Sequence, residues 1–195
     1  VGVKRVHRIW RREGLKVPHK QPKRGRLWLN DGSCIRLRPE YANHVWSYDF
    51  VEDRTHNGRK YRMLNIIDEF TRECLAIRVS RRLKAVDVID ALTDLFILRG
   101  IPAHIRSDNG PEFISHEFTE WAKKHGIRID YIQPGKPQQN AYIERHNKTI
   151  RYSWVSKHLF DTLEEVQDYA TKWLWFYNHE RPHQANGGNP PLMAA

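Results

Sequence analysis

The sequence predicts an α/β domain: a mixed five-stranded sheet with helices on its faces. Two observations predict it. Three consecutive strand-like segments come first, and two of them flank Asn57-Gly58, the dipeptide most typical of a tight β-hairpin. Beyond them, helix-like and strand-like segments alternate along the chain. The 195 residues suffice for one well-cored domain with appendages, and no apolar run approaches the roughly 20 residues of a membrane span.

The three first strands are predicted to pair as an antiparallel meander. Residues 44–51 (HVWSYDFV) and 60–70 (KYRMLNIIDEF) lie on either side of the Asn57-Gly58 turn. Both central positions of a type I′ turn need positive φ, which Asn and Gly adopt most readily. Residues 73–80 (ECLAIRVS) follow directly as the third strand.

Helices and strands alternate in the rest of the chain. Residues 84–99 place apolar side chains at helical spacing, and Gly100 ends that helix. Ser115 and Thr162 are suitable N-caps for two later helices. The remaining predicted elements are a strand at 104–107, a helix at 115–125, a strand at 127–132, and helices at 141–158 and 163–178. Three hairpin-linked strands followed by this alternation is the order of the ribonuclease H-like fold.

The basic charge is concentrated at the start of the chain. The net charge is +10, and residues 1–40 hold twelve Lys and Arg against three acids, so the other 155 residues are nearly neutral. Such an arm attracts phosphate backbones through counterion release, although a solvated linker would have the same composition. We therefore expect a basic arm at 1–40, with a helix at 4–13 and then a linker, a catalytic core at 41–160, and a C-terminal helix and tail at 161–195 packed on it.

Three carboxylates are candidate metal ligands. Asp49 lies near the end of the first predicted strand, Asp108 follows the fourth, and Glu144 lies in the first turn of a long helix. Each alone has an ordinary explanation as a strand polar group, a turn residue or a favourable acid near a helix N-terminus. Together, at one edge of such a sheet, they are hard oxygen ligands of the kind that Mg²⁺ and Mn²⁺ prefer.

The segments around these carboxylates resemble the motifs of retroviral-integrase-like DDE transposases. The motifs are Trp46-x-x-Asp49-Phe50, Ser107-Asp108-Asn109-Gly110-Pro111-Glu112-Phe113 and Pro134-Gly135-Lys136-Pro137-Gln138-x-Asn140-Ala141-x-Ile143-Glu144-Arg145. The 35 residues between Asp108 and Glu144 match that family's spacing. The tail, Tyr177-Asn178-His179-Glu180-Arg181-Pro182-His183-Gln184-Ala185, resembles the C-terminal signature of bacterial insertion sequences whose transposase joins two overlapping reading frames.

The chain departs from that pattern in two places. Asn186 stands where the group has an apolar residue, and the tail after it is irregular. The retroviral branch also carries a zinc-binding His/Cys domain, which His7, His19 and Cys34 do not supply, so the bacterial branch is favoured.

The resemblance implies DNA strand cleavage followed by strand transfer, which integrates a mobile element. It implies two Mg²⁺ ions, replaceable by Mn²⁺, held by Asp49, Asp108 and Glu144. Asn147, Lys148 and Arg151 share the helix face of Glu144, and these three, with Lys136 and Arg145, are candidate DNA contacts. Further candidates lie in the arm: Lys4, Arg5, Arg8, Arg11, Arg12, Lys23, Arg24 and Arg26.

Two other functions remain open from the sequence. One is a ribonuclease H-like nuclease without strand transfer, and the other is a non-catalytic DNA-binding remnant or regulator. The basic arm and the tail favour the transposase, and the three carboxylates count against the remnant. The expected partners are DNA, as element ends and target, and at least one further copy of the chain, because two DNA ends must be joined. A bacterial cytoplasmic protein associated with the nucleoid is expected, with no membrane contact.

Overall fold

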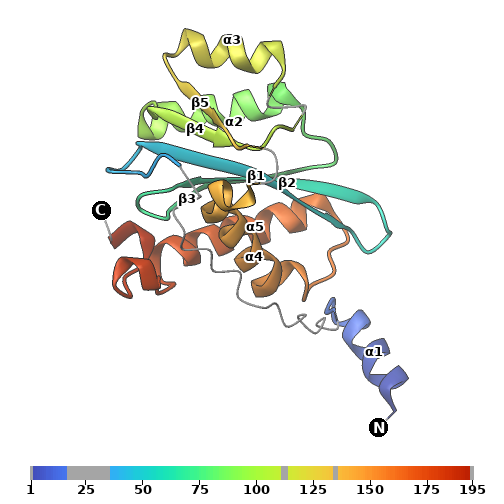
Figure 1. The fold of residues 1–195 in the computed structure, drawn as a ribbon. Helices are drawn as coiled ribbons and strands as arrows, with labels where there is room; N and C mark the ends of the chain where they lie inside the picture. Colours follow the sequence, from blue (N-terminus) through green and yellow to red (C-terminus); the bar gives the residue numbers. More distant parts are fainter. Residues whose placement is uncertain (1, 17–35, 111–113, 134–135, 194–195) are drawn as a thin grey trace.

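The structure, a computed structural model, describes residues 2–16, 36–110, 114–133 and 136–193. Its centre is a five-stranded sheet in the order β3-β2-β1-β4-β5 (Figure 1). The strands are β1 (Val45–Arg54), β2 (Lys60–Asp68), β3 (Cys74–Ser80), β4 (His104–Ser107) and β5 (Arg128–Tyr131). The first three are antiparallel neighbours, whereas β4 pairs with β1 and β5 pairs with β4 in parallel. This mixed five-stranded sheet confirms the predicted fold class.

Helices cover both faces of the sheet. They are α2 (Ala85–Arg99) and α3 (His116–Lys124) on one face, and α4 (Ala141–Ile150) and α5 (Leu163–His179) on the other (Figure 1). Short helical turns stand at Pro137–Asn140, Gln184–Asn186 and Pro191–Met193. None of the helices within the described ranges is both long and apolar enough to cross a bilayer.

Alternation along β1 divides the core into two layers. Trp46 and Tyr48 belong to the cluster under α2 and α3, and Val51 belongs to the cluster under α4 and α5. Because successive side chains point to opposite faces, Asp49 shares the face of Val51 and α4. The carboxylate therefore faces the helix that carries Glu144. Trp173 and Tyr177 of α5 are also buried in the second cluster, whereas Trp175 and Phe176 are exposed.

Some element boundaries differ from prediction. β1 extends to Arg54, so Asp49 lies in the middle of the strand and not near its end. The helix expected at 141–158 is α4 followed by a π-helical turn, Arg151–Val155, in which Ser156 N donates to Arg151 O at 2.9 Å. The wider turn allows the consecutive side chains Trp154 and Val155 both to be buried.

The first hairpin is at the predicted place with a different turn. Thr55 N donates to Arg59 O at 3.0 Å, which closes a three-residue loop, and Gly58 alone has positive φ, 80°. The two-residue type I′ turn, with both Asn57 and Gly58 at positive φ, was therefore wrong. A three-residue loop that ends in a left-handed glycine is another common connection between two antiparallel strands.

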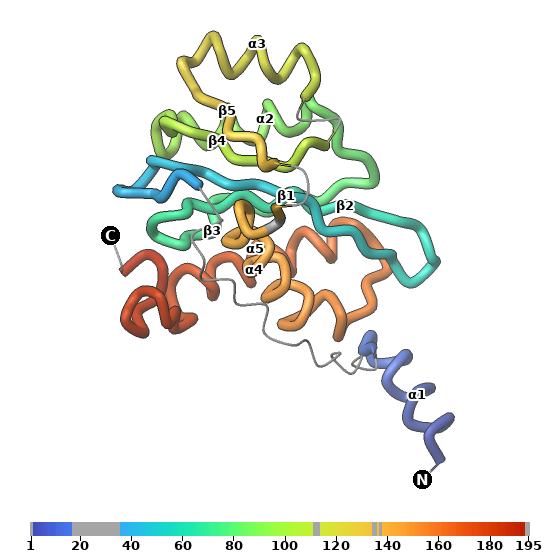
Figure 2. Tube along the Cα trace, in the orientation of Figure 1, coloured from blue at the N-terminus to red at the C-terminus, as the bar shows by residue number. Residues whose placement is uncertain are grey.

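The N-terminal helix α1 (Val3–Arg12) has no buried residue and lies beside the core (Figure 2). Its connection to the core runs through Gly14, where φ is 67° and an added Cβ would lie 3.3 Å from Leu159 O. Lys16 Nζ then lies 2.6 Å from Asp53 Oδ2. Glycine is required here by both the backbone conformation and the close approach.

The outer edge of β3 is covered by two side-chain amides of α5. Asn178 accepts from Cys74 N at 2.9 Å and donates to Cys74 O at 2.8 Å. Gln167 accepts from Val79 N at 2.9 Å and donates to Ile77 O at 2.9 Å. Backbone groups that an edge strand leaves open are thereby satisfied. Cys74 itself is a free, buried thiol, and Cys34 lies outside the described residues.

Candidate active site

Asp49 is a half-buried carboxylate at the centre of β1. Its Oδ1 accepts a hydrogen bond from Phe50 N at 2.7 Å, and its Oδ2 accepts one from Asn147 Nδ2 at 2.8 Å. Burial raises the pKa of Asp49 to about 6, and the negative charges of Asp108 and Glu144 add to that rise. The field of both other candidate carboxylates therefore reaches Asp49.

Asp108 follows β4 directly and is also half-buried. Its Oδ1 accepts from Gly110 N at 3.1 Å, which forms a local turn. In the parallel pair of β1 and β4, Ser47 stands opposite Arg106. Two residues further along each chain segment are Asp49 and Asp108, so the continuing register places these two carboxylates side by side.

Glu144 lies in the first turn of α4 and is exposed. It lines a cavity of about 1190 Å³ together with Asp49. Asp108 does not line this cavity. No three acidic, His or Cys side chains in the described ranges form a complete metal site. The carboxylates are thus electrostatic neighbours without a closed ligand cage.

The donor set nevertheless fits a hard divalent cation. A partly desolvated carboxylate whose proton affinity is raised by neighbouring carboxylates also favours a cation that would neutralise the group. All three supply oxygen ligands, and an incompletely coordinated site suits Mg²⁺, which keeps several of its waters. The raised pKa of Asp49 is the observation that carries this fit.

Asn147 lines the cavity with Glu144, whose helix face it was predicted to share as a candidate DNA contact. It is nevertheless buried, and its amide donates to Asp49. Its Oδ1 in turn accepts from Asn65 Nδ2 at 2.7 Å. Asn65 stands opposite Asp49 in the register of β1 and β2. Sequence reasoning missed Asn65, although a lone amide between Leu64 and Ile66 in an apolar strand was a usable signal.

Basic side chains form the wall of the cavity beside α4. Arg145, Lys148 and Arg151 are exposed there, as the sequence predicts for groups that could contact phosphates. Lys157 and Arg181 also line this cavity, and neither is among the DNA contacts predicted from the sequence. Lys136 is exposed but is not part of the wall.

The basic side chains of the arm lie apart from the cavity. Lys4, Arg5, Arg8, Arg11 and Arg12 are exposed on α1, which projects away from the sheet in Figure 1, and none of them lines the cavity. The remaining arm candidates, Lys23, Arg24 and Arg26, lie outside the described residues.

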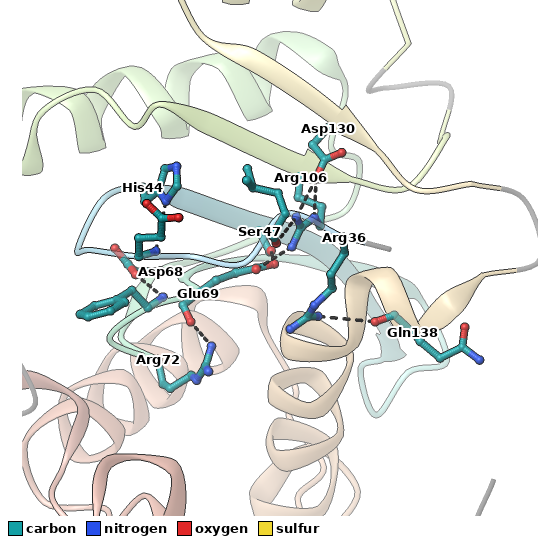
Figure 3. A network of polar contacts seen from close by, with 12 residues as sticks. Arg36, His44, Ser47, Asp68, Glu69, Arg72, Arg106, Asp130 and Gln138 are labelled. Atoms are coloured by element: carbon teal, nitrogen blue, oxygen red, sulfur yellow. Dashed lines mark hydrogen bonds and ion pairs between the residues drawn. The ribbon is translucent and has the colours of Figure 1, made fainter. Parts of the chain in front are cut away.

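A buried ion network supports β4 next to the carboxylates (Figure 3). Arg106 is 1 % exposed and lies 2.6 Å from Glu69 Oε2, and its Nε donates to Asp130 Oδ2 at 2.8 Å. Its third contact is Leu37 O, at 2.8 Å from Nη2. Ser47 also donates to Glu69. The network joins β1, β4 and β5 to the segment that leads into the core.

Two family models cover most of the chain. An integrase core domain model matches residues 39–137, and a second integrase core domain model matches residues 125–191. An IS407 insertion element protein of Burkholderia multivorans is 37% identical over 182 residues, which are 93% of this chain and 65% of that protein. An IS476 insertion element protein of Xanthomonas euvesicatoria is 35% identical over 195 residues, or 100% of this chain and 56% of that protein. The chain thus spans about three fifths of the length of these relatives.

Solved integrase structures share the fold. The HTLV-2 integrase catalytic core domain in complex with magnesium has a TM-score of 0.58 at 21% identity, covering 78% of this chain and 95% of that one. The simian T-cell lymphotropic virus intasome gives 0.66 at 24% identity, covering 92% and 60%. With the family models and the insertion element relatives, the chain belongs to the integrase core domain family and is similar to proteins of bacterial insertion elements.

Proposed function

We propose that this chain is the catalytic region of a transposase that cleaves DNA and transfers the cut strand to a target. Asp49, Asp108 and Glu144 are its catalytic carboxylates. The raised pKa of the half-buried Asp49, caused by burial and then by its two acidic neighbours, is the main support. The cavity that Asp49 and Glu144 line is also lined by several cations, as expected for a site that takes a polyanion.

The proposed cofactor is Mg²⁺, with Mn²⁺ as a substitute and two ions in each site. Bound there, such ions activate a water or a 3′-hydroxyl and neutralise charge on the entering and leaving oxygens of an in-line displacement. Asp49 would hold the ions together with Asp108 and Glu144, because hydrogen bonds orient both of its oxygens and both other carboxylates contribute to its raised pKa. The relative solved with magnesium supports the choice of ion.

The other groups of the site orient Asp49 or bind DNA phosphates. Asn147 holds Asp49 Oδ2 in place and is itself held by Asn65, so we assign both to positioning. Lys148, Arg151 and Arg145 offer cations to the phosphates that flank the scissile bond, with Lys136 and the arm as further contacts. At least two copies would act together on two DNA ends, in the bacterial cytoplasm. The dimeric and trimeric forms of the HTLV-2 core agree with self-association.

Resealing of a branched DNA that mimics the integration product tests this function. This reverse reaction depends least on DNA-recognition regions outside the core. In Mn²⁺ we expect wild type and Glu164→Gln, an exposed acid in the first turn of α5, to join the strands. Glu144→Gln, the matched change in the first turn of α4, should not join them.

The alternatives predict other products. Hydrolysis without any joined strand would favour a nuclease. A folded wild-type protein that binds the branched DNA and leaves it unchanged would favour the non-catalytic remnant. If Glu144→Gln joined strands near the wild-type rate, the assignment of the three carboxylates as catalytic would be wrong.

A further inference from the structure

A second cavity lies on the other side of α4 from Glu144. It measures about 230 Å³ and is bounded by α4, by the turn between β2 and β3, and by the tail that follows α5. At about 30 Å³ for each water, this is room for several waters or for one phosphate group. Three arginines, Arg72, Arg145 and Arg181, line it.

Among the described residues, these three arginines have no carboxylate partner. Arg72 instead stacks over the Tyr142 ring, with its Cζ 3.5 Å from the ring centroid, and donates to Glu69 O. Their charges act inside the cavity, because burial and then the same three arginines lower the pKa of His183. Three cations converging without a counterion make the cavity selective for an anion.

The cavity also contains buried ring nitrogens without partners. His146 is 3 % exposed and lines the cavity, and neither of its ring nitrogens has a hydrogen-bond partner in the described part of the chain. The Nδ1 atom of His183, which also lines the cavity, likewise has no hydrogen-bond partner among the described residues. A neutral imidazole always carries one N–H donor, and a buried donor without an acceptor costs about 1–3 kcal/mol. An oxyanion in the cavity would accept from both rings.

Hydrogen bonds fix the backbone on both sides of the cavity. Arg72 has φ 68°, and its N donates to Asp68 O at 3.0 Å. On the tail side, Asn186 Nδ2 donates to Thr71 O at 2.9 Å. The two walls are thus tied to each other, and the cavity is preformed.

The position of the cavity indicates the source of the anion. Arg145 and Arg181 line both this cavity and the larger one that contains Asp49 and Glu144. An anion bound here would therefore lie next to a strand engaged at the carboxylates. A DNA backbone supplies a regular series of phosphates along such a path.

We propose that Arg72, Arg145 and Arg181 form a pocket for one backbone phosphate of the DNA strand that crosses α4, with His146 and His183 as hydrogen-bond donors. The pocket gives the tail signature around Arg181 and His183 a binding role. The inference rests on the proposed function for the identity of the strand, but not for the existence of an anion site.

Neutral phosphates along the branched DNA test the pocket. Methylphosphonate is placed at one phosphate at a time, and binding is measured with EDTA for wild type, Arg72→Gln and Arg82→Gln. Arg82 is an exposed arginine after β3 and serves as the matched control. At one position we expect about tenfold weaker binding for wild type and the control, and no further loss for Arg72→Gln. Equal losses in all three proteins at every position would overturn the proposal.

Inorganic phosphate gives a readout that needs neither DNA nor activity. Millimolar phosphate should raise the Tm of wild type and Arg82→Gln, and should raise that of Arg72→Gln and Arg181→Gln much less. A phosphate effect without any sensitive DNA position would mean that the site takes free phosphate, which overturns the assignment to DNA. If wild type neither bound nor resealed DNA, the proposed function would fail while this measurement still decided the pocket. Arg72→Lys keeps the cation should Arg72→Gln not fold, and should retain part of both effects.

Discussion

Asn147 donates a hydrogen bond of 2.8 Å to Asp49 Oδ2 and so joins α4 to the central strand of the sheet. The bond fixes the orientation of one carboxylate by means of the helix that carries another, Glu144. Asn65 holds the far side of the same amide. The geometry of the site is therefore set by neutral groups behind it, which can be changed without altering its charge.

Asn147→Ala should lower strand joining by about 10- to 100-fold, the usual effect of removing an outer-shell partner of a metal ligand. The concentration of Mn²⁺ that gives half-maximal activity should rise, whereas DNA binding in EDTA should not change. Asn65→Ala should show the same pattern more weakly, because it acts through Asn147. An unchanged Mn²⁺ requirement in Asn147→Ala would mean that the amide has only a packing role.

Asp49→Asn should stabilise the metal-free protein at neutral pH. The pKa of Asp49 is raised to about 6 in the folded protein from 3.8, so the unfolded chain loses this proton first as pH rises. The free energy of unfolding of wild type should therefore fall between about pH 4 and 6, relative to the variant, by about 1–3 kcal/mol. Urea unfolding across this range measures the difference.

Below about pH 4, the ionisation of Asp49 should contribute no difference in the free energy of unfolding between wild type and Asp49→Asn. Adding Mg²⁺ at pH 7 should stabilise wild type more than Asp49→Asn, because the ion favours the ionised carboxylate. A stability difference that is constant from pH 3 to 7 would contradict the assigned pKa.

Loss of one partner from the buried pair of Arg106 and Glu69 should be severely destabilising. Glu69 is fully buried, so Glu69→Gln leaves the Arg106 charge only partly compensated by Asp130, at a cost of about 3–5 kcal/mol. The matched control is Asp94→Asn, because Asp94 and its partner Arg78 are largely exposed. That change should cost less than about 1 kcal/mol. Similar Tm values for the two variants would show that the network contributes little.

Lys148→Gln and Arg151→Gln should each weaken DNA binding and reduce its dependence on salt. Each phosphate contact contributes about 0.9 to the slope of log K against log salt, so one lost contact lowers the slope by about that amount. Lys172→Gln, on the exposed face of α5, provides the comparison. A slope equal to wild type in Lys148→Gln would place that lysine outside the interface.

The order of elements was predictable because its signals are local. The strand segments, the N-caps at Ser115 and Thr162, and glycines after helices all act within a few residues, and both caps are confirmed. The carboxylates came from motif spacing and remain proposals. The boundaries at residues 40 and 160 also stay predictions, although Leu37 is already bonded to Arg106 in the core.

What the sequence could not supply depends on how distant elements meet. The inward position of Asn147 follows from the contact of α4 with β1 and β2, 98 and 82 residues away in the chain. The π-helical turn arises because Trp154 and Val155 must both reach the core, a requirement that helical periodicity alone does not express. The extra length of β1 comes from its register with β2, which runs to Arg54 and Lys60.

The amides of Gln167 and Asn178 occupy four outward backbone groups of β3. An open edge strand is a template on which another chain can add a strand, the usual route to aggregation and domain swapping. Here α5 fills that role within the same molecule, so its two amides block strand addition at β3. Copies of the chain that met on DNA, as proposed, would not associate through this edge of the sheet.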